Sequence, residues 1–299
     1  MAKFHILLVV LLIASLLPTV AHAKRIARQA KHHHVSRHVF KRHAIRQHSL
    51  RPTISSRAAV VLNLATGKTL YTKNSDRHLP IASLTKLMTA MVVIDSKRSL
   101  IKPARITTDD VDRLKWSRSR LPVGSLLFRK TMLHIALMAS ENRAAFALSR
   151  DYPGGRKGFV AAMNQTAKKL KMLHSHFFDP TGLSPLNVST ARDLTLLARA
   201  AYRYPEIREY ATAHQKLVLC GDGPLMYHNT DPLVYDASWH VLMQKTGFTN
   251  EAGHCLIIVT MVQGHPMLFV LLGAPGRHAH FKDAAALRKW LFKKPTLHR

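Results

Sequence analysis

A serine and a lysine stand three residues apart in Ser83-Leu84-Thr85-Lys86, at the start of an apolar segment that continues to Ile94. On a helix this spacing puts both side chains on one face and within reach of each other. An uncharged lysine amine can accept the proton of a serine hydroxyl, so the pair can produce a nucleophile without histidine. Taken alone, the motif is more typical of a serine that caps a helix. A second copy, Ser99 to Lys102, has no apolar helix behind it, and we assign it no role.

The sequence Ser140-Glu141-Asn142 lies between two segments with helical patterning, Thr131–Ala139 and Arg143–Leu148. We therefore expect it to form the corner between two helices. A hydroxyl and a carboxamide at such a corner can relay a proton and hold a substrate. The alternative is a capping serine beside a surface asparagine.

The sequence Lys245-Thr246-Gly247 ends a predicted strand that begins near Val241. A glycine there lets a substrate approach the edge of a sheet closely, and the lysine and threonine side chains can bind a carboxylate. A second cation would also disfavour protonation of Lys86. Lowering the pKa of Lys86 to about 7.5 would cost about 4 kcal/mol. An ordinary strand end is the alternative interpretation.

Strand patterns occur at both ends of the sequence, and helical patterns lie between them. Ala58–Leu64 and Lys68–Lys73 predict a hairpin, and a closing helix is expected over Ala279–Phe292. The other expected strands are Gln215–Leu219, Leu225–His228, Val241–Lys245, Leu256–Val262 and Met267–Leu272. This order predicts an α+β fold in which both chain ends build one antiparallel sheet, with a helical lobe at about residues 84–204.

The first residues have the three parts of a secretory signal peptide, a basic start at Lys3, an apolar run from Ile6 to Leu17, and Ala21-His22-Ala23. The apolar run is shorter than the 20 or so residues of a membrane anchor. We expect cleavage after Ala23 and a protein exported to the periplasm. Residues 24–57 hold ten Lys/Arg, six His and no acidic residue, which predicts a disordered basic tail, or a tether to an anionic surface. The catalytic unit would then be residues 58–299.

The two cysteines, Cys220 and Cys255, are too few for a disulfide scaffold. Their spacing does not establish a pair, and we expect free thiols. No metal or organic cofactor is implied, because serine and lysine can supply both nucleophile and base. His32-His33-His34 is not accompanied by a carboxylate or cysteine and does not predict a dedicated metal site.

The three motifs, in this order and in these contexts, form the constellation of the penicillin-recognising serine enzymes. From about Ala58 to Trp290 the sequence resembles the D-alanyl-D-alanine peptidases among the low-molecular-mass penicillin-binding proteins, which have a β-lactamase/transpeptidase-like fold. The stretches that carry the resemblance are Ile81–Ala90, Ser140–Ala145, Asp179–Ser184 and Lys245–Gly253. The Ser-Glu-Asn motif and the Asn-Glu-Ala-Gly that follows Lys245-Thr246-Gly247-Phe248-Thr249 are most similar to the endopeptidase branch.

The resemblance implies a role for each motif residue. Ser83 would be the acylated nucleophile, and Lys86 its general base. Ser140 and Asn142 would shuttle the proton and hold the substrate.

By the same resemblance, Lys245 and Thr246 would bind the carboxylate of a peptide or a β-lactam inhibitor. Gly247 and Phe248 would also belong to the substrate-binding site. The backbone N–H groups of Ser83 and Phe248 would form the oxyanion hole.

The resemblance leaves other activities open. A D-alanyl-D-alanine carboxypeptidase needs the same residues, although the extra C-terminal domain and membrane-binding helix of that branch are not expected here. A β-lactamase would need a carboxylate that activates water, and Glu206 and Glu209 are available but lie in no recognisable deacylation motif. A non-catalytic cell-wall-binding protein is the alternative from another class, and the intact motifs argue against it.

The formal net charge is +29, of which the basic tail carries +10 and residues 58–299 carry +18. Such a charge is typical of proteins that bind nucleic acid, an anionic membrane or an acidic polymer. For an exported protein we expect no nucleic-acid partner and at most peripheral, electrostatic contact with a membrane. Peptidoglycan, rich in stem-peptide carboxylates, is the expected partner, and the sequence carries no signal for an oligomeric state.

Binding of the protein to isolated cell walls should therefore weaken as salt rises, because the Debye length falls from about 30 Å at 0.01 M to about 3 Å at 1 M salt. Co-sedimentation over this range of sodium chloride measures the effect. Binding that does not change with salt would contradict an electrostatic attraction to the wall.

Overall fold

The structure is a computed structural model that describes residues 51–221 and 223–294. The expected signal peptide, its cleavage after Ala23, His32-His33-His34 and residues 24–50 of the expected basic tail lie outside the described residues. The description below concerns the compact unit that begins at Pro52.

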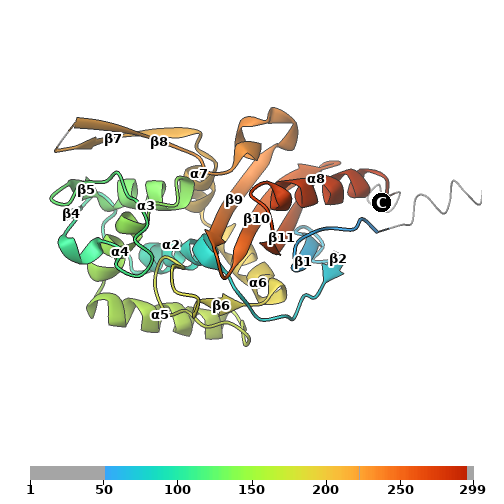
Figure 1. Ribbon diagram of the computed structural model, residues 1–299, viewed down its shortest axis with the longest axis horizontal. Coiled ribbons are helices and arrows are strands. Elements are labelled where there is room, and N and C mark those ends of the chain that lie inside the picture. Colours follow the sequence, from blue (N-terminus) through green and yellow to red (C-terminus); the bar gives the residue numbers. More distant parts are fainter. Residues whose placement is uncertain (1–50, 222, 295–299) are drawn as a thin grey trace, which may run out of the picture. The chain divides into compact units, whose positions relative to one another are not determined.

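Five antiparallel strands form the main sheet, in the order β2-β1-β11-β10-β9 (Figure 1). Strands β1 (Ala58–Asn63) and β2 (Thr69–Lys73) come from the start of the unit, and β9 (Val241–Thr249), β10 (Gly253–Val262) and β11 (His265–Ala274) from its end. Val61 pairs with Phe269 where β1 and β11 join the two groups. The predicted antiparallel sheet from both chain ends is confirmed, and β9 is one of its two edges.

The period-two alternation of the strands divides the core into two layers. Val61, Ile258 and Phe269 face helix α8 (Ala279–Phe292), which covers one side of the sheet. Val60, Ile257 and other residues of opposite parity face the helices on the other side. A strand that is buried on both faces explains the continuous apolar run of β10.

The helical lobe contains six α-helices, which are α2 (Thr85–Asp95), α3 (Arg129–Met138), α4 (Asn142–Arg150), α5 (Gly155–Lys169), α6 (Ala191–Ala201) and α7 (Pro205–Thr212). Two short strand pairs accompany them, β3 (Leu79–Pro80) with β6 (Val188–Ser189) and β4 (Pro103–Arg105) with β5 (Leu126–Phe128). There are also 3₁₀ turns, η1 (Ala82–Leu84), η2 (Thr108–Asp110), η3 (Pro232–Tyr235) and η4 (Ala237–Trp239). Helix α2 is buried on nearly all sides and forms the centre of the lobe. The helical lobe was expected to end near residue 204, but α7 extends it to Thr212.

Strands β7 (Gln215–Cys220) and β8 (Gly223–His228) occur where strands are expected, but they pair only with each other, outside the main sheet. The pair packs against the helical lobe through Val218 and Tyr227, while Leu217 and Leu219 are exposed. The sequence of a half-buried ribbon resembles that of a sheet strand, and the partner is decided by tertiary packing. Cys220 at the end of β7 and Cys255 on β10 form no disulfide.

Packing of the chain starts before Ala58. Ile54 is buried against the α8 layer. The backbone N–H groups of Ser55 and Ser56 donate to the Asp283 carboxylate of α8 at 2.9 and 2.7 Å, and Arg57 donates to the Ala252 carbonyl at 2.9 Å. The prediction that the disordered tail extends to residue 57 is therefore wrong for residues 54–57. Ser55 and Ser56, which we expected to be part of a linker, bind the buried carboxylate of Asp283.

Candidate active site

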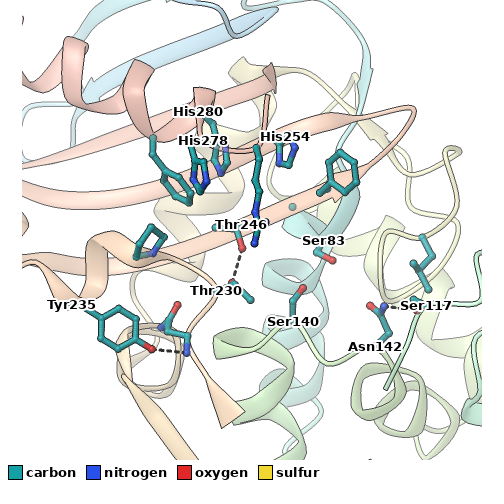
Figure 2. Close-up of a pocket in the computed structure, with 17 residues that line it drawn as sticks. Ser83, Ser117, Ser140, Asn142, Thr230, Tyr235, Thr246, His254, His278 and His280 are labelled. Atoms are coloured by element: carbon teal, nitrogen blue, oxygen red, sulfur yellow. Dashed lines mark hydrogen bonds between the residues drawn. The ribbon is translucent and has the colours of Figure 1, made fainter. Parts of the chain in front are cut away.

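Ser83 and Lys86 meet at the junction of η1 and α2. The preceding residue, Ala82, has a φ of +47°, a conformation that costs free energy for a residue with a Cβ and is found at functional sites. Lys86 Nζ lies 2.8 Å from Ser83 Oγ. Ser83 faces a cavity (Figure 2), whereas Lys86 is 1% exposed behind it.

Three oxygens surround the Lys86 amine. Besides Ser83 Oγ, they are Asn142 Oδ1 at 2.6 Å and the Thr181 carbonyl at 2.9 Å. Burial lowers the pKa of Lys86 from 10.5 to about 7, and the charges of Asp179, Glu141 and Asp112 oppose that shift. A large fraction of the amine is therefore uncharged at neutral pH and able to accept the hydroxyl proton of Ser83.

The Thr181 carbonyl is held in place by a loop folded around Asp179. The Asp179 carboxylate accepts hydrogen bonds from three backbone N–H groups, from the Thr181 hydroxyl and from the Asn187 side chain. Gly182 follows with a φ of +85°, and a Cβ there would stand 1.8 Å from the Ala82 carbonyl oxygen. The loop thus presses against the turn that carries Ser83, and only glycine fits at the contact.

Ser140 and Asn142 occupy the expected corner between α3 and α4. Ser140 has a φ of +60°, and Glu141 caps α4 by accepting the Arg143 N–H at 3.1 Å. Asn142 lies between the lysine and a third serine, because its Nδ2 donates to Ser117 Oγ at 2.9 Å (Figure 2). This bond fixes the amide so that its oxygen faces Lys86.

The sequence motifs did not include Ser117, which lies in a loop between η2 and β5. Asp112 anchors this loop by accepting the N–H groups of Leu114, Lys115 and Ser117 at 2.8, 3.1 and 2.8 Å. The Lys115 side chain forms an ion pair with Glu251 in the β9–β10 turn. The loop therefore joins the helical lobe to the sheet on one side of the cavity.

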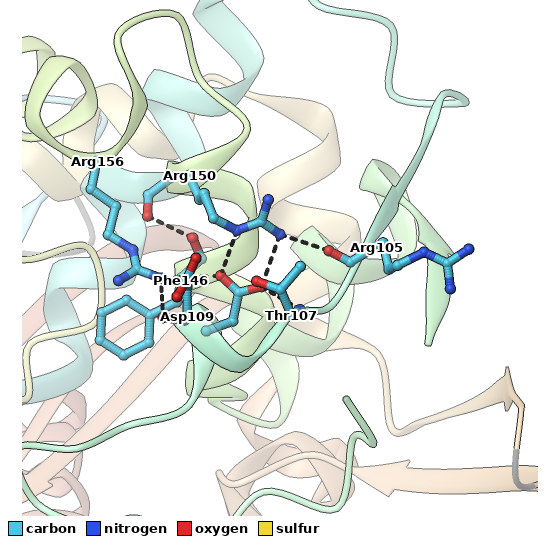
Figure 3. Close-up of polar contacts among 8 residues, drawn as sticks. Arg105, Thr107, Asp109, Phe146, Arg150 and Arg156 are labelled. Carbon is cyan, nitrogen blue, oxygen red and sulfur yellow. Dashed lines mark hydrogen bonds and ion pairs between the residues drawn. The ribbon is translucent and has the colours of Figure 1, made fainter. Parts of the chain in front are cut away.

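The start of the same loop rests on a buried carboxylate, Asp110. Arg150 donates to Asp110 from two nitrogens at 3.0 and 2.9 Å and also to the Arg105 carbonyl at 2.7 Å (Figure 3). Arg156 adds a contact at 3.1 Å, and Asp110 also accepts the Thr107 N–H. The Asp110 carboxylate is fully buried and bound by two guanidinium groups. These charge-assisted hydrogen bonds stabilise the segment that leads to Ser117.

Strand β9 brings the third motif beside the first. A Cβ added to Gly247 would lie 3.1 Å from the Ser83 nitrogen, so the strand and η1 are in close contact. Thr246 and Phe248 line the cavity, and Thr246 Oγ1 lies 2.6 Å from Thr230 Oγ1. Lys245 is fully buried behind this wall, with its Nζ donating to the Thr246 carbonyl at 2.8 Å.

Lys245 and Asp231 form a second buried set of charges. Burial, with the repulsion of Lys86, lowers the pKa of Lys245 well below its usual value, and Asp231 opposes this shift. Burial raises the pKa of Asp231 to about 7. One Asp231 oxygen accepts the Leu233 N–H at 2.9 Å, while Oδ2 has no hydrogen-bond partner among the described residues. Neither Asp231 nor Thr230 was predicted, because they sit in a polar turn without a motif.

The cavity has a volume of about 610 Å³ and is lined by residues of all three motifs. The lining residues from those motifs are Ser83, Ser140, Asn142, Thr246, Gly247 and Phe248. The structure thus brings the predicted residues together around one space (Figure 2), with Lys86 and Lys245 behind its surface. Such an arrangement can activate a hydroxyl, bind a carboxylate and present two N–H groups to an oxyanion.

Comparisons with known proteins agree with this geometry. The model of the D-alanyl-D-alanine carboxypeptidase family of peptidases matches residues 45–276. The chain belongs to this family. Two curated members of this peptidase family, both named D-alanyl-D-alanine endopeptidase, are similar to it. The Pseudomonas aeruginosa protein is 46% identical, over 81% of this chain and 79% of its own. The Escherichia coli protein is 43% identical, over 81% and 78%.

The fold comparison also leads to this class of peptidases. The crystal structure of the Streptomyces K15 DD-transpeptidase superposes with a TM-score of 0.76 and 28% sequence identity, covering 82% of this chain and all of that one. The predicted fold class and family are therefore confirmed.

Replacing Gly182 with alanine should slow acylation of Ser83, because the new Cβ would collide with the Ala82 carbonyl and displace the loop that holds Lys86. A misplacement of about 1 Å at a reacting group can cost about 10²-fold in rate. The rate of labelling by a fluorescent penicillin measures the effect.

Gly67→Ala is the matched control, since Gly67 also has a positive φ but open space around its Cα. Equal rates for Gly182→Ala and Gly67→Ala would show that the loop contact does not position the site.

Proposed function

We propose that this protein is a serine D-alanyl-D-alanine endopeptidase, which cleaves peptidoglycan cross-links through an acyl-enzyme on Ser83. The observation that supports this most is the 2.8 Å contact between Ser83 Oγ and the Lys86 amine, whose pKa of about 7 leaves it able to act as a base. β-Lactams acylate the same serine and inhibit the enzyme.

The reaction begins when Lys86 takes the proton of Ser83 and the Ser83 oxygen attacks the carbonyl carbon of the D-alanine. The N–H groups of Ser83 and Phe248 hold the oxyanion that forms. The C–N bond then breaks, and the leaving amine receives a proton through Lys86 and Ser140, whose positions Asn142 fixes. Water attacks the acyl ester in the same site and returns Ser83 to its free form.

Thr246 and Lys245 have separate tasks in this scheme. Thr246 lies at the cavity and hydrogen-bonds the carboxylate of the leaving group. Lys245 is fully buried behind that wall and donates from its Nζ to the Thr246 carbonyl, which holds Thr246 in position. The two buried amines each disfavour the protonated form of the other.

The relatives support cleavage of cross-links over trimming of terminal D-alanine. The D-alanyl-D-alanine carboxypeptidase DacC of Escherichia coli is 30% identical, and the match covers 62% of that protein. The endopeptidases are more similar and match over more of their length. Against a β-lactamase, Glu206 and Glu209 lie on α7 and are not among the residues that line the cavity.

The proposed substrate places the enzyme outside the cytoplasm. We infer export by a signal peptide cleaved after Ala23, and attraction of the positively charged protein to an anionic wall. In the part of the chain that the structure describes, no helix is long and apolar enough to cross a bilayer.

A fluorescent penicillin should label the protein, and Ser83→Ala should abolish the label. Because Lys86 must be uncharged to accept the proton, the labelling rate should fall as the pH is lowered through about 7. Rapid-quench labelling between pH 5 and 9 measures both.

Ser99→Ala is the control, since Ser99 begins the second Ser-x-x-Lys sequence at an exposed position. If the parent protein took up no penicillin, the enzymatic proposal would be wrong and the wall-binding alternative would gain. Steady hydrolysis of nitrocefin would favour a β-lactamase.

The purified protein should convert cross-linked dimeric muropeptides to monomers, since the cavity is larger than a single D-alanine requires. Chromatography of the digest measures the products, with Ser83→Ala as the blank. Shortening of uncross-linked pentapeptides alone would mean that the enzyme is a carboxypeptidase.

A further inference from the structure

One end of the cavity is built by residues that the acylation chemistry does not use. Arg277 and His278, both exposed, come from the connection between β11 and α8, and His280 follows in the first turn of α8. His278 and His280 lie with His254 of β10 on one side of the cavity, away from Ser140 and Asn142 (Figure 2), and Arg277 also lines the cavity and acts electrostatically on His254. We call these four residues the α8 end of the cavity. No acidic residue is among those that line the cavity.

The rings at the α8 end lie in successive contact, stacked from Phe248 to His280 and tilted by 37° between His280 and Phe281. Phe248 lies 4.2 Å from His254, His254 lies 5.3 Å from His280, and His280 lies 3.9 Å from Phe281, measured between ring centroids. The stack ties the residue after Lys245-Thr246-Gly247 to the start of α8. It gives the α8 end a fixed wall of ring faces rather than flexible side chains.

The positive charge at this end is concentrated on Arg277. Burial, together with His278 and Arg277, lowers the pKa of His254, and burial lowers the pKa of His280 to about 4. Both imidazoles are therefore neutral at neutral pH, while the guanidinium carries its charge and several donors. His280 is 3% exposed, and its Nδ1 has no hydrogen-bond partner among the described residues.

The start of helix α8 adds to this potential. A helix leaves its first N–H groups without internal partners and carries partial positive charge at that end. Helix α8 has 14 residues, no acidic residue in its first turn and no side-chain cap from His278. Arginine and a helix N-terminus together are a favourable setting for an anion.

Another part of the cavity lining comes from η3. It consists of Pro232 and Tyr235, and the Tyr235 hydroxyl is engaged with the backbone at Asn229 and His214. A chain that leaves Ser83 past Thr246 would therefore have Tyr235 and the cationic α8 end within the same cavity. That combination fits an extended peptide with a carboxylate, and a single amino acid would not fill it.

We propose that the α8 end of the cavity binds a carboxylate of the departing stem peptide, one that lies beyond the carboxylate held at Thr246. This subsite rests on the proposed endopeptidase function and deepens it. It makes the enzyme prefer a leaving group that is a whole stem peptide over one that is a single D-alanine. Arg277 is the residue that contributes most, through a charge-assisted hydrogen bond.

The test compares Arg277→Gln with Lys282→Gln, which removes an exposed charge one turn further along α8, outside the cavity lining. Arg277→Gln should lower kcat/KM for a cross-linked muropeptide dimer about tenfold or more, mainly through KM, as expected for loss of one charged hydrogen bond. Arg277→Lys should recover part of the loss. Lys282→Gln should match the parent protein.

Two further substrates separate the subsite from the chemistry. The rate of acylation by penicillin, which carries no stem peptide, should change less than about twofold in Arg277→Gln. A dimer whose stem-peptide carboxylates are amidated should be cleaved equally slowly by the parent and by Arg277→Gln.

Three results would count against the subsite. They are unchanged dimer cleavage in Arg277→Gln, an equal fall in penicillin acylation and dimer cleavage, and an equal loss in Lys282→Gln. Failure of the parent protein to react with penicillin is a different outcome, since it would remove the proposed function itself.

Discussion

The structure depends on keeping one amine, that of Lys86, out of water and next to a serine. Lowering its pKa from 10.5 to about 7 corresponds to about 5 kcal/mol, which the rest of the fold must offset. Three oxygens meet the amine, and each comes from a different part of the lobe: η1, the α3–α4 corner and the Asp179 loop. Central helix α2, apolar around the lysine, supplies the burial.

The carboxylates around the site explain why burial does not remove the lysine's charge altogether. Asp179, Glu141 and Asp112 each favour the protonated amine, and each also has a structural task as an acceptor of backbone N–H groups. Their negative charge is partly satisfied by those bonds. The pKa of Lys86 is therefore about 7, because desolvation lowers it by more than the three carboxylates raise it. Lys245 resembles Lys86 in this respect, since burial lowers its pKa well below its usual value and the charge of Asp231 opposes the shift.

The sequence was sufficient for the parts of this site that are local. Ser83 and Lys86 share a helix turn, and alternating or continuous apolar runs mark the strands, so their existence could be predicted. Ser117 and Thr230 could not be predicted, because their side chains join the site through hydrogen bonds to residues that are not their neighbours in the sequence. The same reason applies to the β7–β8 pair, whose partner is set by packing, and to residues 54–57, whose buried carboxylate partner is on α8.

The high positive charge of the chain and the lowered pKa of Lys86 have separate electrostatic causes. A net charge of +29 gives a positive potential around a protein, and such a potential favours the approach of anions. Salt screens exposed charges over about 8 Å in physiological conditions, so the distant ones contribute little to the amine. Within the protein, burial is the main cause of the lowered pKa of Lys86, and Asp179, Glu141 and Asp112 oppose it. The exposed charges therefore govern long-range attraction, whereas burial governs the pKa of Lys86.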